Sequence, residues 1–263
     1  MRFALAVIFV GFSFVASQSV AQSRTGFVQG HHAKNTGLIV SVGHGLPGLE
    51  YDVEMAESVM NHASYKFGIT KIEEEDGTKE SVAEALTKMS EDAGDGGTAF
   101  FYYTGHGSPD SLYLYDGSLT SDKIRGAVAL GREGRSPLAR LVMIFDSCFS
   151  GSLLDPMRTM KMTMLEERSS LISFVNSMTE TMSRGETYWD SLMVIASSRA
   201  DQTSAASPEG SIFTLAMKQA FDEVAESRGT VGTFFDKAKE YTKHHEPVAR
   251  FVPESLRDEK LID

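Results

Sequence analysis

The segment "ARLVMIFDSC", residues 139–148, decides the fold class of this chain. Its apolar residues run without interruption from Leu141 to Phe145, which is typical of a strand buried on both faces of a parallel sheet. A second run of this kind, "TAFFYYTG" over residues 98–105, is followed directly by His106. Strands with two buried faces need helices on both sides. The two segments therefore predict an α/β fold with a mostly parallel sheet.

Segments with strand and helix patterns alternate along the rest of the chain. Further buried strands are expected over residues 37–43, 69–74 and 191–198, and a small strand or hairpin over 112–115. Amphipathic helices are expected over residues 49–67, 78–93, 118–130, 212–226 and 230–245. This order of elements predicts a three-layer α/β/α sandwich with a mostly parallel central sheet.

Two reactive side chains follow two of the predicted strands. In open α/β sheets, ligands bind beyond the carboxyl ends of the strands, where His106 and Cys148 are expected. If the two strands are neighbours, the imidazole and the thiol face each other. His106 could then raise the thiolate fraction and later protonate a leaving amine. The backbone N–H groups of Gly107 and Cys148 are expected to form the oxyanion hole.

The N-terminal segment, residues 1–21, has the pattern of a secretory signal peptide. Arg2 supplies a positive charge, an apolar run follows, and the small residues Ser19 and Ala21 suit a cleavage site. The alternative is an uncleaved membrane anchor, but the apolar run is shorter than the span of about 20 residues that a bilayer needs. We therefore expect an exported protein, periplasmic or extracellular, with no membrane association once the signal is removed.

Cys148 is the only cysteine of the chain. Secreted proteins usually pair their thiols or lack them. One interpretation of a single thiol is an inert, buried, small apolar residue, which is the usual state of a free cysteine. The expected export favours the other interpretation, a thiol that works as a nucleophile.

The chain is expected to form one domain over residues 37–250, after a flexible lead-in over 22–36. Residues 155–187 are interpreted as a linker or insert, and 251–263 as a C-terminal tail. The 263 residues contain 41% hydrophobic residues, enough for a full core, and the formal net charge is −11. Such an acidic chain is a poor candidate for binding nucleic acid.

Two motifs carry a resemblance to a known family. "FFYYTGHGS" (100–108) and "IFDSCFSGS" (144–152) resemble the histidine and cysteine motifs of the caspase-like cysteine peptidases, the C14-like family. They are most similar to the branch of metacaspases and bacterial caspase homologues. The resemblance covers about residues 37–227 and includes "SSRADQTS" (197–204). It implies a caspase-like sandwich in which His106 and Cys148 form a dyad that cleaves peptide bonds through a thioacyl-enzyme intermediate.

The resemblance also implies the substrate preference. True caspases have glutamine two residues before the nucleophile and cut after aspartate, whereas this chain has Asp146, as metacaspases do, and those prefer arginine or lysine. Asp52 is carried over as a second pocket carboxylate, and Thr104 and Ser198 as residues of the substrate cleft. Carboxylates bind a guanidinium through charge-assisted hydrogen bonds. The alternatives are an exposed helix acid for Asp52 and a loop cap for Ser198.

Some metacaspases need calcium, although the chemistry itself requires no cofactor. Asp155 matches one acidic ligand position of those enzymes, and Asp116 and Asp122 lie in the right region. Carboxylates scattered over loops are common, and oxygen ligands alone do not establish a site. A calcium activator is therefore a hypothesis that rests on the resemblance.

Two departures from the family pattern leave alternatives open. Phe149 replaces the usual histidine and Thr104 the usual serine. Because of Phe149, a catalytically silent caspase-like module that acts by binding is the second interpretation. The insert over 155–187 contains basic residues that suit self-cleavage, but its methionines are also typical of residues that fill gaps in a core. A serine hydrolase is excluded, because no glycine-x-serine-x-glycine elbow is present. Peptide substrates with basic residues are the expected partners.

Overall fold

The computed structural model describes residues 33–108, 110–148, 150, 188–199, 202–243 and 245–262. In these residues a six-stranded sheet runs in the order β11-β8-β7-β3-β1-β2. All neighbouring pairs are parallel except β11 with β8. The predicted mostly parallel sheet is confirmed. Its strands are β1 (Asn35–Val42), β2 (Gly68–Glu73), β3 (Thr98–Gly105), β7 (Arg140–Ser147), β8 (Leu192–Ala196) and β11 (Val248–Val252).

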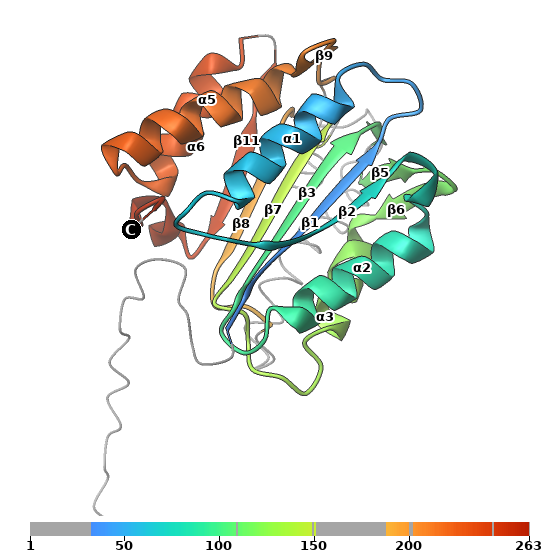
Figure 1. The fold of residues 1–263 in the computed structure, drawn as a ribbon, viewed down its shortest axis with the longest axis vertical. Coiled ribbons are helices and arrows are strands. Elements are labelled where there is room, and N and C mark those ends of the chain that lie inside the picture. The colour runs from blue at the N-terminus through green and yellow to red at the C-terminus, as the bar shows by residue number, and fades with distance from the viewer. Residues whose placement is uncertain are drawn as a thin grey trace, which may run out of the picture.

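Helices cover both faces of this sheet, which confirms the predicted three layers. Figure 1 shows α1, α5 and α6 on one face and α2 and α3 on the other. The bounds are α1 Leu49–Met60, α2 Lys79–Asp92, α3 Ser121–Leu130, α5 Ile212–Ser227 and α6 Val231–Tyr241, with short 3₁₀ helices at Glu74–Asp76 and Glu254–Asp258.

The alternation of side chains along the strands explains why the apolar runs are continuous. In β3, Phe101 and Tyr103 belong to the core under α2 and α3, whereas Phe100 and Tyr102 belong to the core under α1, α5 and α6. β7 divides its side chains between the two cores in the same way. A strand in the middle layer must be apolar on both faces.

Some predicted bounds are wrong. The helix expected to reach residue 67 ends at Met60, because the chain turns back and the Phe67 N–H donates to the Met60 carbonyl (3.2 Å). The helix expected from residue 118 begins at Ser121, because residues 117–120 pair with the preceding strand. The positive φ of Gly117 (132°) suits the start of that pairing.

Two small sheets lie beyond the carboxyl ends of the central strands. The first comprises β4 (Gly107–Ser108), β5 (Ser111–Leu114) and β6 (Gly117–Thr120), and it follows β3 directly. The second pairs β9 (Ala206–Ser207) with β10 (Gly210–Ser211), ahead of α5. The second small sheet contributes Ala206 and Ser211 to the pocket that His106 and Cys148 line, and the first begins one residue after His106.

The C-terminal residues are part of the fold. The boundary expected at residue 250 falls inside β11, so it is wrong as an end of the domain. Beyond β11, Leu256 and Leu261 are buried in the core, and the Tyr65 hydroxyl donates to the Leu261 carbonyl. The domain therefore extends through residue 262.

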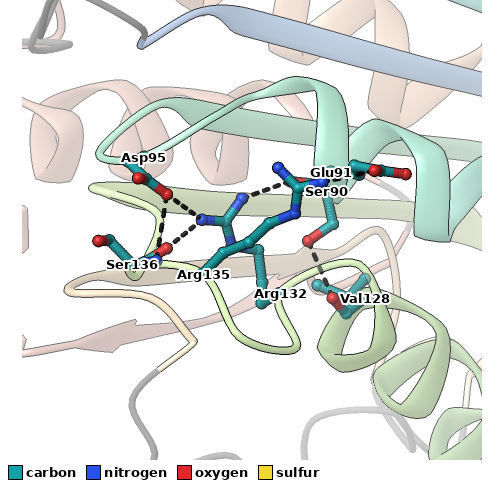
Figure 2. A network of polar contacts seen from close by, with 7 residues as sticks. All are labelled: Ser90, Glu91, Asp95, Val128, Arg132, Arg135 and Ser136. Carbon is teal, nitrogen blue, oxygen red and sulfur yellow. Dashed lines mark hydrogen bonds and ion pairs between the residues drawn. The ribbon is translucent and has the colours of Figure 1, made fainter.

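A buried arginine links α2, α3 and two adjoining loops at the amino end of the sheet (Figure 2). The Arg132 guanidinium donates to the Ser90 carbonyl (2.8 Å), to the Ser136 carbonyl, and to Asp95 Oδ1 (3.3 Å). The Ser90 hydroxyl in turn donates to the Val128 carbonyl of α3 (2.8 Å). These contacts fasten the ends of α2 and α3 to the loops that lead into β3 and β7.

Several sequence expectations lie outside the described residues: the signal peptide over 1–21, most of the lead-in over 22–36, the insert over 155–187, Phe149 and Asp155. Among the helices that the structure describes, none combines the length and apolarity needed to span a bilayer.

Candidate active site

The register of the central strands brings the predicted dyad to one place. β3 and β7 are parallel neighbours, which meets the condition set for the dyad, with Gly105 opposite Ser147. His106 and Cys148 are the next residue of each strand, and both line a single pocket at the carboxyl edge of the sheet. An imidazole and a thiol that line the same pocket are the two groups that nucleophilic catalysis by a cysteine uses.

Cys148 is partly exposed, so reagents and substrates can reach its thiol. The sulfur lies 3.8 Å from the carbonyl oxygen of Ser204, which is a residue of the segment after β8. That segment closes the opposite wall of the pocket with Ala205 and Ala206. Ser204 ends the segment 197–204 that carries part of the family resemblance, whereas Ala205 and Ala206 lie in an irregular segment that has no motif.

The backbone at Gly107 is oriented by its neighbour. The His106 carbonyl accepts hydrogen bonds from the Tyr113 N–H (3.0 Å) and the Tyr103 hydroxyl (2.7 Å), so it faces the small sheet. In a trans peptide the C=O and the next N–H point in opposite directions, so the Gly107 N–H points away from that sheet. A side chain at Gly107 would place its Cβ 2.6 Å from the Cys148 carbonyl oxygen, so only glycine fits. Gly107 is not among the residues that line the pocket, so its role as an oxyanion donor stays a prediction.

Asp146 points into the pocket from β7. Its side chain is 3% exposed, and its carboxylate accepts hydrogen bonds from Thr214 Oγ1 (2.6 Å), Ser204 Oγ (3.1 Å) and the Ser211 hydroxyl. All three donors are neutral hydroxyl groups. The carboxylate is therefore desolvated and hydrogen-bonded, but none of these contacts supplies a positive charge.

Asp52 is the second pocket carboxylate, and the alternative of an exposed helix acid is wrong. It is 1% exposed and accepts hydrogen bonds from Thr104 Oγ1 (2.7 Å) and the Ser211 N–H (2.7 Å). Burial, followed by the charge of Asp146, raises the pKa of Asp52 to about 7. Two neighbouring carboxylates in a desolvated pocket are costly to ionise together.

Ser211 is the pocket residue that sequence reasoning missed most clearly. It is the N-cap of α5, where its hydroxyl oxygen accepts from the Thr214 N–H (3.1 Å) while the same hydroxyl donates to Asp146. A serine directly before an apolar helix is an N-cap signal, so its place at the helix start could have been predicted. Its contact with two aspartates could not, because it depends on how α5 packs against the sheet.

The other two predicted substrate residues have indirect or different roles. Thr104 lines the pocket, but its buried hydroxyl is bound to Asp52, so it acts through that carboxylate. Ser198 is fully buried and is not among the residues that line the pocket; its hydroxyl donates to the Ser147 carbonyl (3.1 Å). The prediction for Ser198 is therefore wrong, because β8 ends beneath the pocket rather than at its wall.

The predicted calcium ligands are engaged elsewhere. Asp116 Oδ1 accepts from the Lys79 N–H (2.8 Å) at the start of α2, and Asp122 pairs with Arg125 (3.1 Å) on α3. Over residues 33–262, with the gaps stated above, no group of three or more His, Cys, Asp or Glu side chains could hold a metal ion. Since Asp155 lies outside the described residues, calcium activation stays a prediction.

Solved structures with the same fold extend over most of this chain. A protein from Geobacter sulfurreducens is 18% identical, covers 87% of this chain and 98% of its own, and superposes with a TM-score of 0.60. Caspase-1 from Spodoptera frugiperda is 12% identical, covers 88% of this chain and 91% of its own, and has a TM-score of 0.57. Among curated proteins, none is significantly similar in sequence.

The sequence model of one family matches nearly the whole described fold. It is the model of the caspase domain, and it matches residues 35–254, from the start of β1 to beyond β11. Members of this family are cysteine peptidases. The chain therefore belongs to the caspase-domain family.

Proposed function

We propose that this protein is a cysteine endopeptidase that cleaves peptides after arginine or lysine. One observation carries the proposal: two buried carboxylates, Asp52 and Asp146, lie in the same pocket as Cys148 and His106. In the part of the chain that the structure describes, no lysine or arginine forms an ion pair with either aspartate. A cationic side chain of a substrate would supply the missing positive charge.

The proposed chemistry uses only the dyad and the backbone. The Cys148 thiol gives its proton to His106, and its sulfur attacks the scissile carbonyl carbon, so the π electrons move to the carbonyl oxygen. When the tetrahedral intermediate collapses, the C–N bond breaks and the leaving amine takes the proton from the imidazolium. Water then hydrolyses the thioester and regenerates the thiol. The N–H groups of Gly107 and Cys148 stabilise the oxyanion.

The pocket chemistry explains the proposed selectivity. A guanidinium or ammonium group can donate hydrogen bonds to both carboxylates while its positive charge offsets their mutual repulsion. An aspartate side chain would add a third negative charge to the same desolvated space. Asp146, two residues before the nucleophile, supports the proposal that this chain belongs to the metacaspase branch of the family.

Peptide hydrolysis tests this proposal. Fluorogenic peptides that end in Arg, Lys or Asp are offered to the protein and to Cys148→Ala, each with calcium and with a chelator. We expect cleavage after Arg and Lys that is lost in the variant, and the calcium pair decides whether the ion activates. Cleavage after Asp alone would overturn the pocket assignment but leave the dyad.

A thiol assay separates an inactive protein from a wrong choice of peptide. If no peptide is cleaved, the rate at which iodoacetamide alkylates Cys148 near neutral pH is compared with that of free cysteine. Rapid alkylation would support the assignment of Cys148 as an activated nucleophile. Slow alkylation would favour the catalytically silent binding module.

The N-terminal pattern supports a proposed place of action outside the cytoplasm. Cleavage after Ala21 would give a mature chain that begins at Gln22. Mass spectrometry of the protein from cell fractions tests this, and an intact Met1 terminus in the cytoplasm would contradict it.

A further inference from the structure

The hydroxyl groups that hold Asp146 are divided unevenly between its two carboxylate oxygens. Oδ2 accepts from Thr214 (2.6 Å) and from the Ser211 hydroxyl, whereas within the described part of the chain Oδ1 accepts from Ser204 alone (3.1 Å). A carboxylate oxygen has two lone pairs, so two donors fill Oδ2 and one lone pair of Oδ1 is left. That lone pair is the one that a cationic side chain in the pocket can use.

A second hydroxyl, that of Tyr102 on β3, lies behind Thr214. Tyr102 Oη is 2.5 Å from Thr214 Oγ1, and both residues are 1% exposed or less. Thr214 has a single hydroxyl proton, which it donates to Asp146, so Tyr102 is the donor of this contact. Burial, followed by the charges of Asp52 and Asp146, raises the pKa of Tyr102 well above its ordinary value, so the hydroxyl keeps its proton. A chain of two O–H donors therefore runs from Tyr102 through Thr214 to Asp146.

This chain makes the two pocket carboxylates unequal. Hydrogen bonds to a carboxylate stabilise its charge, and donors in series strengthen one another. Asp146 receives three donors, one of them backed by Tyr102, whereas Asp52 receives two. Burial, followed by the charge of Asp146, raises the pKa of Asp52 to about 7. With the proton on Asp52, Asp146 carries the negative charge of the free pocket.

Tyr102 and Thr214 are outside the active-site pocket. Neither is among the residues that line it. Both line an apolar cavity between α1, α5 and the sheet instead. Any effect of Tyr102 on a bound substrate must therefore pass through Thr214 and Asp146.

We propose that Tyr102 is a positioning residue for substrate specificity: through Thr214 it holds Asp146 so that Oδ1 keeps its free lone pair for the cationic side chain of the substrate. This inference rests on the proposed peptidase function. The Ser204 hydroxyl that binds Oδ1 belongs to the residue whose carbonyl lies 3.8 Å from the Cys148 sulfur. Oδ1 therefore faces the wall segment that also contacts the nucleophile. Loss of the chain would let the carboxylate turn, which lowers the affinity for a cation and leaves the dyad unchanged.

A double-mutant cycle on Tyr102→Phe and Thr214→Val tests the inference. The variants are made in the Cys148→Ala background, and calorimetry measures the Kd of a peptide amide that ends in arginine. We expect Thr214→Val to weaken binding roughly tenfold and Tyr102→Phe roughly threefold, since Thr214 still donates to Asp146 in the second variant. In the Thr214→Val background, Tyr102→Phe should have no further effect, because the link to Asp146 is already broken.

Matched controls separate positioning from a general loss of stability. A peptide with citrulline in place of arginine has the same shape without the charge, and its Kd should not respond to Tyr102→Phe. Thr36→Val removes a buried threonine hydroxyl that donates to the Met89 carbonyl (2.8 Å) at the amino end of the sheet. It should lower Tm and leave the Kd of the arginine peptide unchanged. With Cys148 present, iodoacetamide should alkylate Tyr102→Phe at the wild-type rate.

The outcomes separate this inference from the function on which it rests. A wild-type protein that cleaves after arginine, together with equal binding of the arginine peptide by all variants, would overturn the inference alone. A loss of affinity from Tyr102→Phe that persists in the Thr214→Val background would also overturn it, because the tyrosine would then act by another route. A wild-type protein that neither binds nor cleaves an arginine peptide would overturn the proposed specificity and the inference together.

Discussion

Buried charged side chains have different partners at the two ends of the central sheet. At the amino end, the buried Arg132 guanidinium is surrounded by acceptors from its own chain, including the Asp95 carboxylate. At the carboxyl end, the buried carboxylates of Asp52 and Asp146 receive only hydroxyl and N–H donors. In the part of the chain that the structure describes, the first arrangement pairs the buried cation with a carboxylate, although the Arg132 Nε–H has no partner, whereas the second has no counter-charge. The difference supports the proposal that the amino end stabilises the fold and the carboxyl end binds substrate.

We expect the largest loss of activity when a negative charge is removed from the carboxyl end of the sheet. Asp146→Asn should lower kcat/KM for an arginine peptide roughly 10³-fold, because a buried cation that loses its partner costs about 3–5 kcal/mol. Iodoacetamide should still alkylate Cys148 at the wild-type rate. The matched control is Asp95→Asn at the amino end, which should keep full activity. Equal losses in both variants would remove the proposed distinction between the ends.

The pair of carboxylates should also cost stability at high pH. The folded protein keeps the Asp52 proton up to about pH 7, whereas the unfolded chain releases it near the ordinary value of 3.8. The free energy of unfolding should therefore fall as the pH rises from about 4 to 7. Asp52→Asn should be more stable than wild type at pH 8, by up to about 4 kcal/mol, with the difference vanishing near pH 4. Urea unfolding at both pH values measures this, and a difference that does not change with pH would contradict it.

A substitution at the amino end of the sheet should lower the stability of the protein without changing its activity. Arg132→Met leaves the buried carbonyls of Ser90 and Ser136 without their donor, which should lower the free energy of unfolding by about 2–3 kcal/mol. The kcat/KM of the folded fraction should stay at the wild-type value. Thermal unfolding and peptide hydrolysis on the same sample test both statements. A loss of activity without a loss of stability would show that the two ends are coupled.

The smallest expected effect is on substrate affinity. A cationic side chain binds best when both carboxylates are charged, so Asp52 must release its proton on binding. KM for an arginine peptide should therefore fall roughly tenfold between pH 6 and pH 8, since one proton is linked to binding. In Asp52→Asn this dependence should disappear. A KM that is flat with pH in the wild type would indicate that Asp52 is already ionised.

Continuous apolar strands followed by reactive residues were enough to predict the sheet and the neighbourhood of His106 and Cys148. The burial of Asp52 was also predictable in principle, because it lies three residues after Leu49 and four before Ala56, on the buried face of α1. The position of Ser198 could not be predicted, because a sequence motif does not show which side of a strand end faces the pocket.

The wall formed by residues 204–211 and the packed C-terminal strand were beyond sequence reasoning for a related reason. Their contacts are made with segments that are distant in the chain, such as β8 for β11 and Asp52 for Ser211. Local patterns set which elements form, whereas the partner of an edge strand or loop depends on the assembled core.

Ser211 restricts how this pocket can change in evolution. Its N–H binds Asp52, its hydroxyl binds Asp146, and the same hydroxyl caps α5. A lineage that replaced either carboxylate to gain a new substrate would also loosen the first turn of a long core helix. New specificity would therefore require a change in β7 or α1 together with a change at the start of α5, so substitutions at these positions should occur together in relatives.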